Sequence, residues 1–126
     1  MILAKVRASA LPGIFLILFL LASVGVAQTP ARATLVRIQV TARKYTFNPE
    51  VITVNAGGRV ELIITAVDRD HGITIPAFGV KQYLKKGVPT TVSFIASKPG
   101  SFAFHCSVFC GMGHRHMKGK LVVRAR

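Results

Sequence analysis

The chain has 126 residues, which is enough for one small domain and too few for two domains of ordinary size. Seventeen Lys and Arg side chains stand against four Asp and Glu, so the formal net charge is +13. Such a charge favours acidic partners or an anionic membrane surface, and a generally solvated basic surface is an equal alternative. The basic residues are scattered rather than clustered, which argues against nucleic acid as the partner.

The N-terminal part of the sequence is apolar. Lys5 and Arg7 are followed by 20 residues without a charge. The pattern is typical of a signal peptide, with the small residues Gly25 and Ala27 at its end, but 20 residues also suffice for one membrane anchor. We expect residues 1–27 to be either, and the remainder to be exported to the periplasm or another extracytoplasmic space. That remainder keeps a net charge of +11.

Beyond a short polar linker at residues 28–33, the sequence predicts β-strands. Apolar and polar residues alternate in several short runs that are rich in Val, Ile and Thr. The expected strands cover residues 35–41, 51–54, 60–65, 71–75, 88–95, 101–105 and 120–123. Turn residues separate them at residues 47–50, 55–58 and 98–100. Residues 81–86 are expected to hold no more than a turn, and the whole predicts an all-β, antiparallel sandwich over residues 34–126.

A run of metal-binding residue types lies between the last two expected strands. It contains both cysteines of the chain, in the spacing Cys106-x₃-Cys110-x₃-His114-x₂-Met117. Two thiolates, an imidazole and a thioether are soft ligands, and such a set selects copper rather than a hard cation. One thiolate with His and Met makes a mononuclear blue site, whereas two thiolates can bridge a pair of copper ions.

This run resembles the loop of the binuclear CuA centre in cytochrome c oxidase subunit II, a centre that nitrous oxide reductase also has. Upstream, residues 68–76 read Asp-Arg-Asp-His-Gly-Ile-Thr-Ile-Pro, which is similar to the family's segment that brings a second His to the centre. The resemblance covers residues 34–126. It implies a cupredoxin-like Greek-key β-sandwich with copper as the cofactor, two ions in a CuA centre.

The resemblance also implies the ligands. They are His71, Cys106, Val108 through its backbone carbonyl, Cys110, His114 and Met117. The two cysteines would bridge the coppers, each histidine would bind one copper, and the thioether and the carbonyl would be weak ligands on different coppers. Gly111 and Gly113 are expected to let the loop turn tightly, because glycine tolerates positive φ.

Four neighbouring side chains are assigned to other roles. His116 breaks the family spacing and is expected either to face solvent or to lie behind the metal ligands without binding the metal. His105 directly precedes the first cysteine, so it should point to the other side of its strand and pack or form hydrogen bonds there. Asp68 or Asp70 is expected to orient the His71 ring by accepting a hydrogen bond, as carboxylates commonly do beside metal-bound histidines.

Three features depart from the family pattern. Trp is absent, so Phe78, Phe109 or Tyr83 would replace the family's aromatic entry point for electrons. Many members have Glu where this chain has Val108, and the Glu side chain helps to hold a magnesium ion that valine cannot hold. CuA domains usually present acidic surfaces to a basic cytochrome c, whereas this domain is basic.

The leading hypothesis is an electron-transfer subunit of an oxidase-type oxidoreductase, not a catalyst on its own. It would take electrons from a donor protein, such as an acidic cytochrome, and pass them to a terminal oxidase or similar acceptor. One alternative is an exported copper carrier or assembly protein that binds Cu(I). Others are a mononuclear blue-copper carrier built from His71, Cys110, His114 and Met117, and a structural Cys₂His₂ zinc site.

Overall fold

The computed structural model describes residues 9, 25–29 and 32–126. The chain divides into a unit of residues 1–30 and a unit of residues 31–126. The expected signal peptide or anchor, residues 1–27, lies mostly outside the described residues. Within the described residues, no helix is both long enough and apolar enough to cross a membrane. The second unit holds all the strands that the structure describes.

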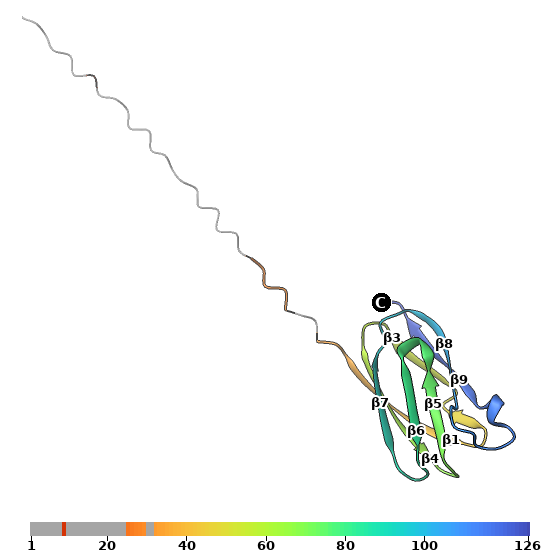
Figure 1. Ribbon diagram of the computed structural model, residues 1–126. Coiled ribbons are helices and arrows are strands. Elements are labelled where there is room, and N and C mark those ends of the chain that lie inside the picture. Colours follow the sequence, from red (N-terminus) through yellow and green to blue (C-terminus); the bar gives the residue numbers. More distant parts are fainter. Residues whose placement is uncertain (1–8, 10–24, 30–31) are drawn as a thin grey trace, which may run out of the picture. The chain divides into compact units, whose positions relative to one another are not determined.

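Short strands and two 3₁₀ turns make up the second unit (Figure 1). In chain order they are β1 (Leu35–Arg43), β2 (Thr46–Asn48), β3 (Val51–Asn55), β4 (Arg59–Ala66), β5 (His71–Ile75), η1 (Pro76–Phe78), β6 (Val80–Leu84), β7 (Thr90–Ile95), β8 (Gly100–His105), η2 (His114–His116) and β9 (Lys118–Arg124). The predicted all-β sandwich is therefore confirmed.

The strands form two sheets, a four-stranded sheet in the order β2-β1-β4-β7 and a five-stranded sheet in the order β3-β9-β8-β5-β6. Most neighbours are antiparallel, but β1 pairs with β4 and β3 pairs with β9 in parallel. Parallel neighbours need a crossover between them, so the chain passes repeatedly from one sheet to the other. One such passage places β5 beside β8 in the five-stranded sheet.

Alternating apolar residues build the core between the sheets. Along β4, Val60, Leu62 and Ile64 are fully buried, and the residues between them are less buried. From the facing sheet, Phe104 of β8 packs edge-to-face on Phe47 of β2, with ring centroids 5.2 Å apart. Because every second side chain of a strand points to the same face, period-2 alternation in the sequence becomes this two-sided core.

Two local predictions were wrong. Residues 81–86 were expected to hold a turn, but Val80–Leu84 is the edge strand β6 of the five-stranded sheet. Its three middle residues are exposed and only its ends are buried, so no alternation marks it in the sequence. Part of the turn expected at residues 47–50 belongs to the short edge strand β2, and the chain turns only after Asn48.

Candidate metal centre

Two elements bring the candidate ligands together. His71 is the first residue of β5, and residues 106–117 form the loop between β8 and β9. Thr74 of β5 pairs with His105 of β8, so the start of β5 lies beside the start of this loop. The Cys106 N–H donates to the Met117 carbonyl at 2.9 Å and closes the base of the loop. The loop thus folds back over its own ends.

The donor atoms of all six candidate residues lie in one chain of contacts. Cys106 Sγ is 3.8 Å from Cys110 Sγ, 4.0 Å from His71 Nδ1 and 3.1 Å from the Val108 carbonyl oxygen. On the other side, Cys110 Sγ lies 3.7 Å from His114 Nδ1 and 3.7 Å from the thioether sulfur of Met117. Each sulfur therefore has its own imidazole and its own weak donor.

Three of these residues form a tighter group. The ligand atoms of His71, Cys106 and Cys110 all lie within 4.8 Å of one another. These three side chains are buried, as is Met117, and Cys106 is the most exposed at 2%. His114 is half-buried. Such burial excludes water from the donor atoms of these four side chains, while His114 and Val108 lie nearer the surface.

Asp68 fixes the orientation of the buried His71 ring. Its Oδ1 lies 2.7 Å from His71 Nε2. A carboxylate can only accept a hydrogen bond, so Nε2 must carry the proton. The other nitrogen, Nδ1, then has a free lone pair and faces Cys106 Sγ. The ring is held in the tautomer that a metal ligand needs.

Asp68 is itself held by the backbone. Oδ2 accepts the Lys44 N–H at 2.8 Å, and Oδ1 also accepts the Arg69 N–H at 2.9 Å. Burial alone would raise the pKa of the Asp68 carboxyl, but the hydrogen bonds from Lys44, His71 and Arg69 outweigh it and lower the pKa to about 2. The carboxyl is therefore ionised at neutral pH.

Asp70 points elsewhere. It accepts the Tyr83 hydroxyl and, at 2.7 Å, the Lys86 N–H. These two bonds lower the pKa of the Asp70 carboxyl, and the same contact with Asp70 raises the pKa of the Tyr83 hydroxyl. Of the two aspartates that the sequence left open, Asp68 is the one that contacts His71.

The Cys110 thiol is protonated at neutral pH in the absence of metal. Burial, and Cys106 beside it, raise the pKa of the Cys110 thiol to about 11. A metal binds the thiolate rather than the thiol. Metal binding must therefore release this proton, and affinity should rise with pH.

The Tyr45 ring, which sequence analysis missed, packs against the loop at Gly111 and Gly113. A Cβ placed on Gly113 would lie 2.4 Å from Tyr45 Cδ2, and one placed on Gly111 would lie 2.6 Å from the Tyr45 hydroxyl oxygen. Gly111 has φ of +132°, as expected, but Gly113 has φ of −89°. Gly113 is thus needed for close approach and not for positive φ.

The remaining histidines lie outside this cluster. His105 is exposed on β8, on the side opposite the buried Phe104 and Cys106. His116 is exposed at the end of η2.

No sequence pattern predicted that Tyr45 would pack against the loop. Residues 45 and 113 are far apart in the chain, and only the sheet topology brings them together.

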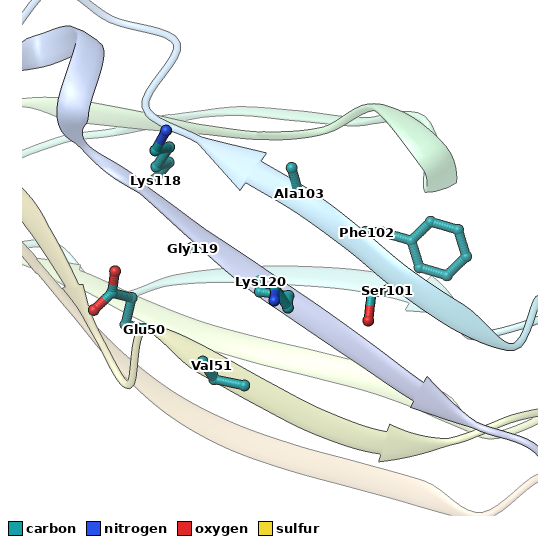
Figure 2. Close-up of a pocket in the computed structure, with 8 residues that line it drawn as sticks. All are labelled: Glu50, Val51, Ser101, Phe102, Ala103, Lys118, Gly119 and Lys120. Atoms are coloured by element: carbon teal, nitrogen blue, oxygen red, sulfur yellow. The ribbon is translucent and has the colours of Figure 1, made fainter.

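A groove elsewhere on the domain has no side chains comparable to the candidate metal ligands. It has a volume of about 640 Å³ and lies on the outer face of β3, β9 and β8 (Figure 2). Its charged lining residues are Glu50, Lys118 and Lys120, and no cysteine or histidine lines it. The candidate centre is therefore the loop and His71.

Comparison with known proteins defines the class. The family model described as a cupredoxin-like domain matches residues 13–123. The chain belongs to this family of cupredoxin-like domains, as its two-sheet fold and its loop site also indicate.

Among curated proteins, the chain is 29% identical over 87 residues to cytochrome c oxidase subunit 2 of Thermus thermophilus, covering 69% of this chain and 64% of that protein. It is 30% identical over 92 residues to nitrous-oxide reductase of Stutzerimonas stutzeri, covering 70% of this chain and only 14% of the reductase. The chain thus spans less than two thirds of either relative. The resemblance to oxidase subunit II that the sequence indicates is confirmed.

The fold also matches a solved domain. The periplasmic domain of subunit II of cytochrome oxidase (CoxB) from Bradyrhizobium japonicum superposes with a TM-score of 0.65 and 23% identity, covering 71% of this chain and 83% of that domain. At this identity the match concerns the fold alone.

Proposed function

We propose that this domain transfers electrons through a binuclear copper centre of the CuA type. The observation that carries the proposal is the arrangement of the two sulfurs. Cys106 Sγ and Cys110 Sγ face each other at 3.8 Å, and His71 and His114 approach different sulfurs. Two thiolates with one imidazole at each end are suited to bridging two metal ions.

The donor set fits copper. Thiolate, imidazole and thioether are soft or intermediate ligands, and the hydrogen bond from His71 to Asp68 presents the free Nδ1 to the site. Cys106 and Cys110 would bridge the two ions, and His71 and His114 would each bind one. The Val108 carbonyl and Met117 would be the weak ligands. A bound copper pair would supply reversible one-electron redox chemistry.

The chain's own residues favour a binuclear electron-transfer centre over the alternatives. A mononuclear blue site would leave Cys106 idle, yet its sulfur contacts three candidate donors. A zinc site would leave Met117 unused, although it is fully buried against Cys110. A copper carrier needs exposed ligands for exchange, whereas four of the donor residues here are buried. Buried donors on a rigid sandwich change little when the electron count changes.

The relatives suggest the setting. We place this domain in an extracytoplasmic space, because the solved CoxB domain is periplasmic and the N-terminal sequence predicts export. A terminal oxidase is proposed as the acceptor, because the Thermus thermophilus relative is an oxidase subunit. A redox protein would be the donor.

The test is copper reconstitution of the purified chain under reducing conditions. We expect two coppers per chain and a spin resonance signal in which one electron is shared by two copper nuclei. Cys106→Ser and Cys110→Ser should each abolish that signal, because either change removes a bridging thiolate. If Cys106→Ser keeps the copper content and the signal of the parent, the binuclear proposal is wrong.

A further inference from the structure

The loop that buries its sulfurs also exposes two large apolar side chains. Phe109 is 70% exposed and Met112 is 93% exposed. Both lie among the expected ligands, between Val108 and His114. Phe109 also lines an open hollow beside the candidate centre, and an apolar side chain exposed in a hollow of this kind is a candidate for an interaction site.

Phe109 also contacts the centre from outside. Its ring packs against the His114 ring, with centroids 5.8 Å apart and planes at 52°. His114 Nδ1 is in turn 3.7 Å from Cys110 Sγ. An exposed ring is therefore connected to a candidate bridging sulfur through one imidazole.

Cations lie beside the exposed ring. Phe109 shares an open hollow of about 500 Å³ with Arg69 and Lys86. Within residues 32–126, the ion pairs at 4.0 Å or less involve Arg37, Arg59 and His71, and neither of these two cations. Both remain available to a carboxylate from outside.

The acidic side chains of the same hollow are already engaged. Asp68 accepts hydrogen bonds from two backbone N–H groups and His71, and Asp70 accepts from Tyr83 and a backbone N–H. Both carboxylates are thus paired with donors of the protein itself, within a domain whose net charge is strongly positive. A carboxylate-bearing partner complements this surface better than a basic one.

We propose that Phe109, flanked by Arg69 and Lys86, is the docking surface for an acidic redox protein. One electron passes from that partner to the copper centre through the Phe109 and His114 rings. The partner is oxidised by one electron and the centre is reduced by one, and no covalent bond forms or breaks. This inference rests on the proposed function.

The first test uses small charged redox reagents and charge reversal. Arg69→Glu and Lys86→Glu are compared with Arg124→Glu, which changes the net charge equally. Arg124 ends β9 while Lys118 begins it beside the loop, so about 20 Å separates the control from the loop. Each variant is loaded with copper, and its copper content, spin signal and potential are measured first. A variant series without the binuclear signal would mean that the proposed function has failed, irrespective of docking.

Reduction by hexacyanoferrate(II) and by hexaammineruthenium(II) is then followed by stopped flow at low salt. The two hollow variants should react on the order of tenfold more slowly with the anionic reagent, and faster with the cationic one. Arg124→Glu should change either rate by less than half as much on a logarithmic scale. If the three variants behave alike, net charge alone steers the reaction and the hollow is not the docking surface.

The second test needs no copper. The reduced, metal-free chain is titrated with hexacyanocobaltate(III), a redox-inert anion, while backbone amide shifts are recorded. The largest shifts are expected near residues 69, 86 and 109. Amide shifts confined to the surroundings of other Lys and Arg residues would contradict the proposal.

The third test replaces the reagents with proteins. Phe109→Ala should slow reduction by an acidic c-type cytochrome on the order of tenfold, while Val51→Ala, an exposed apolar residue of β3, should not. A basic cytochrome that reacts faster than the acidic one at low salt would overturn the choice of partner. So would vesicles of anionic lipid that bind the parent chain but not Phe109→Ala, since the occupant would then be a membrane.

Discussion

Asp68→Asn should lower the affinity for copper, although Asp68 is not itself a candidate ligand. Asp68 receives the His71 Nε2–H at 2.7 Å and the Lys44 N–H at 2.8 Å on different oxygens. Asparagine has only one oxygen, so its NH₂ must face one of these donors. If the NH₂ faces His71, the ring must switch tautomer and direct an N–H at Cys106 Sγ. If it faces Lys44, a backbone donor loses its partner.

The structure sets the size of both effects. Loss of a carboxylate that orients a metal-bound histidine costs about 10- to 100-fold in metal affinity. The pKa of Asp68 falls from 3.8 to about 2 in the folded chain, and its side chain is 33% exposed. After allowance for solvent screening, we expect about 1 kcal/mol less stability for the metal-free variant at neutral pH.

The pH dependence has a definite sign. A carboxyl whose pKa is lowered by folding stabilises the fold above its unfolded pKa, here 3.8. That contribution disappears as the pH falls through about 2, the folded value. The stability gap between the parent and Asp68→Asn should therefore be constant from neutral pH down to about 4 and then close.

Copper competition titrations and urea denaturation measure these effects, and Asp70→Asn is the matched control. Asp70 lies two residues away, carries the same charge and bonds to Tyr83 and Lys86 rather than to His71. It should leave copper affinity within about twofold, a difference of about 0.4 kcal/mol. If Asp70→Asn weakens copper binding as much as Asp68→Asn, orientation of the His71 ring is not the cause.

Three further predictions concern the loop. Gly113→Ala should lower copper content sharply, because the added Cβ would lie 2.4 Å from the Tyr45 ring; normal copper content in this variant would show that the ring can move aside. Met117→Leu should keep two coppers and shift the potential measured by redox titration, because a buried thioether is replaced by a side chain of similar volume at a weak position; complete loss of copper would mean that Met117 is a strong ligand. His116→Ala should keep the copper content of the parent while His114→Ala loses copper, and the reverse order would exchange the two histidines.

Sequence patterns predicted most strands because the core alternates. Residues 60–65 alternate between buried and less buried positions in β4, and that period is visible in the sequence. The edge strand β6 was missed because its middle residues, 81–83, are all exposed. An edge strand has only one neighbour and little to bury, so its sequence has no clear period.

The candidate ligands could be predicted because five of the six lie within one short loop. Their supports could not. The sequence Asp-x-Asp-His places two carboxylates near His71. Only the folded conformation of this turn shows that Asp68, and not Asp70, contacts the ring. The contact of Tyr45 with Gly113 joins positions 68 residues apart, and such pairs follow from topology rather than from local pattern.

His71 alone among the candidate ligands comes from another strand, while residues 106–117 supply the rest. An unfolded chain would therefore keep two thiols, an imidazole and a thioether close together in sequence and could bind copper as well. A ligand that binds both states stabilises folding only by the ratio of its two affinities. The gain in folding free energy from copper should thus come largely through His71, and a His71 variant could retain copper while its melting temperature no longer depends on the metal.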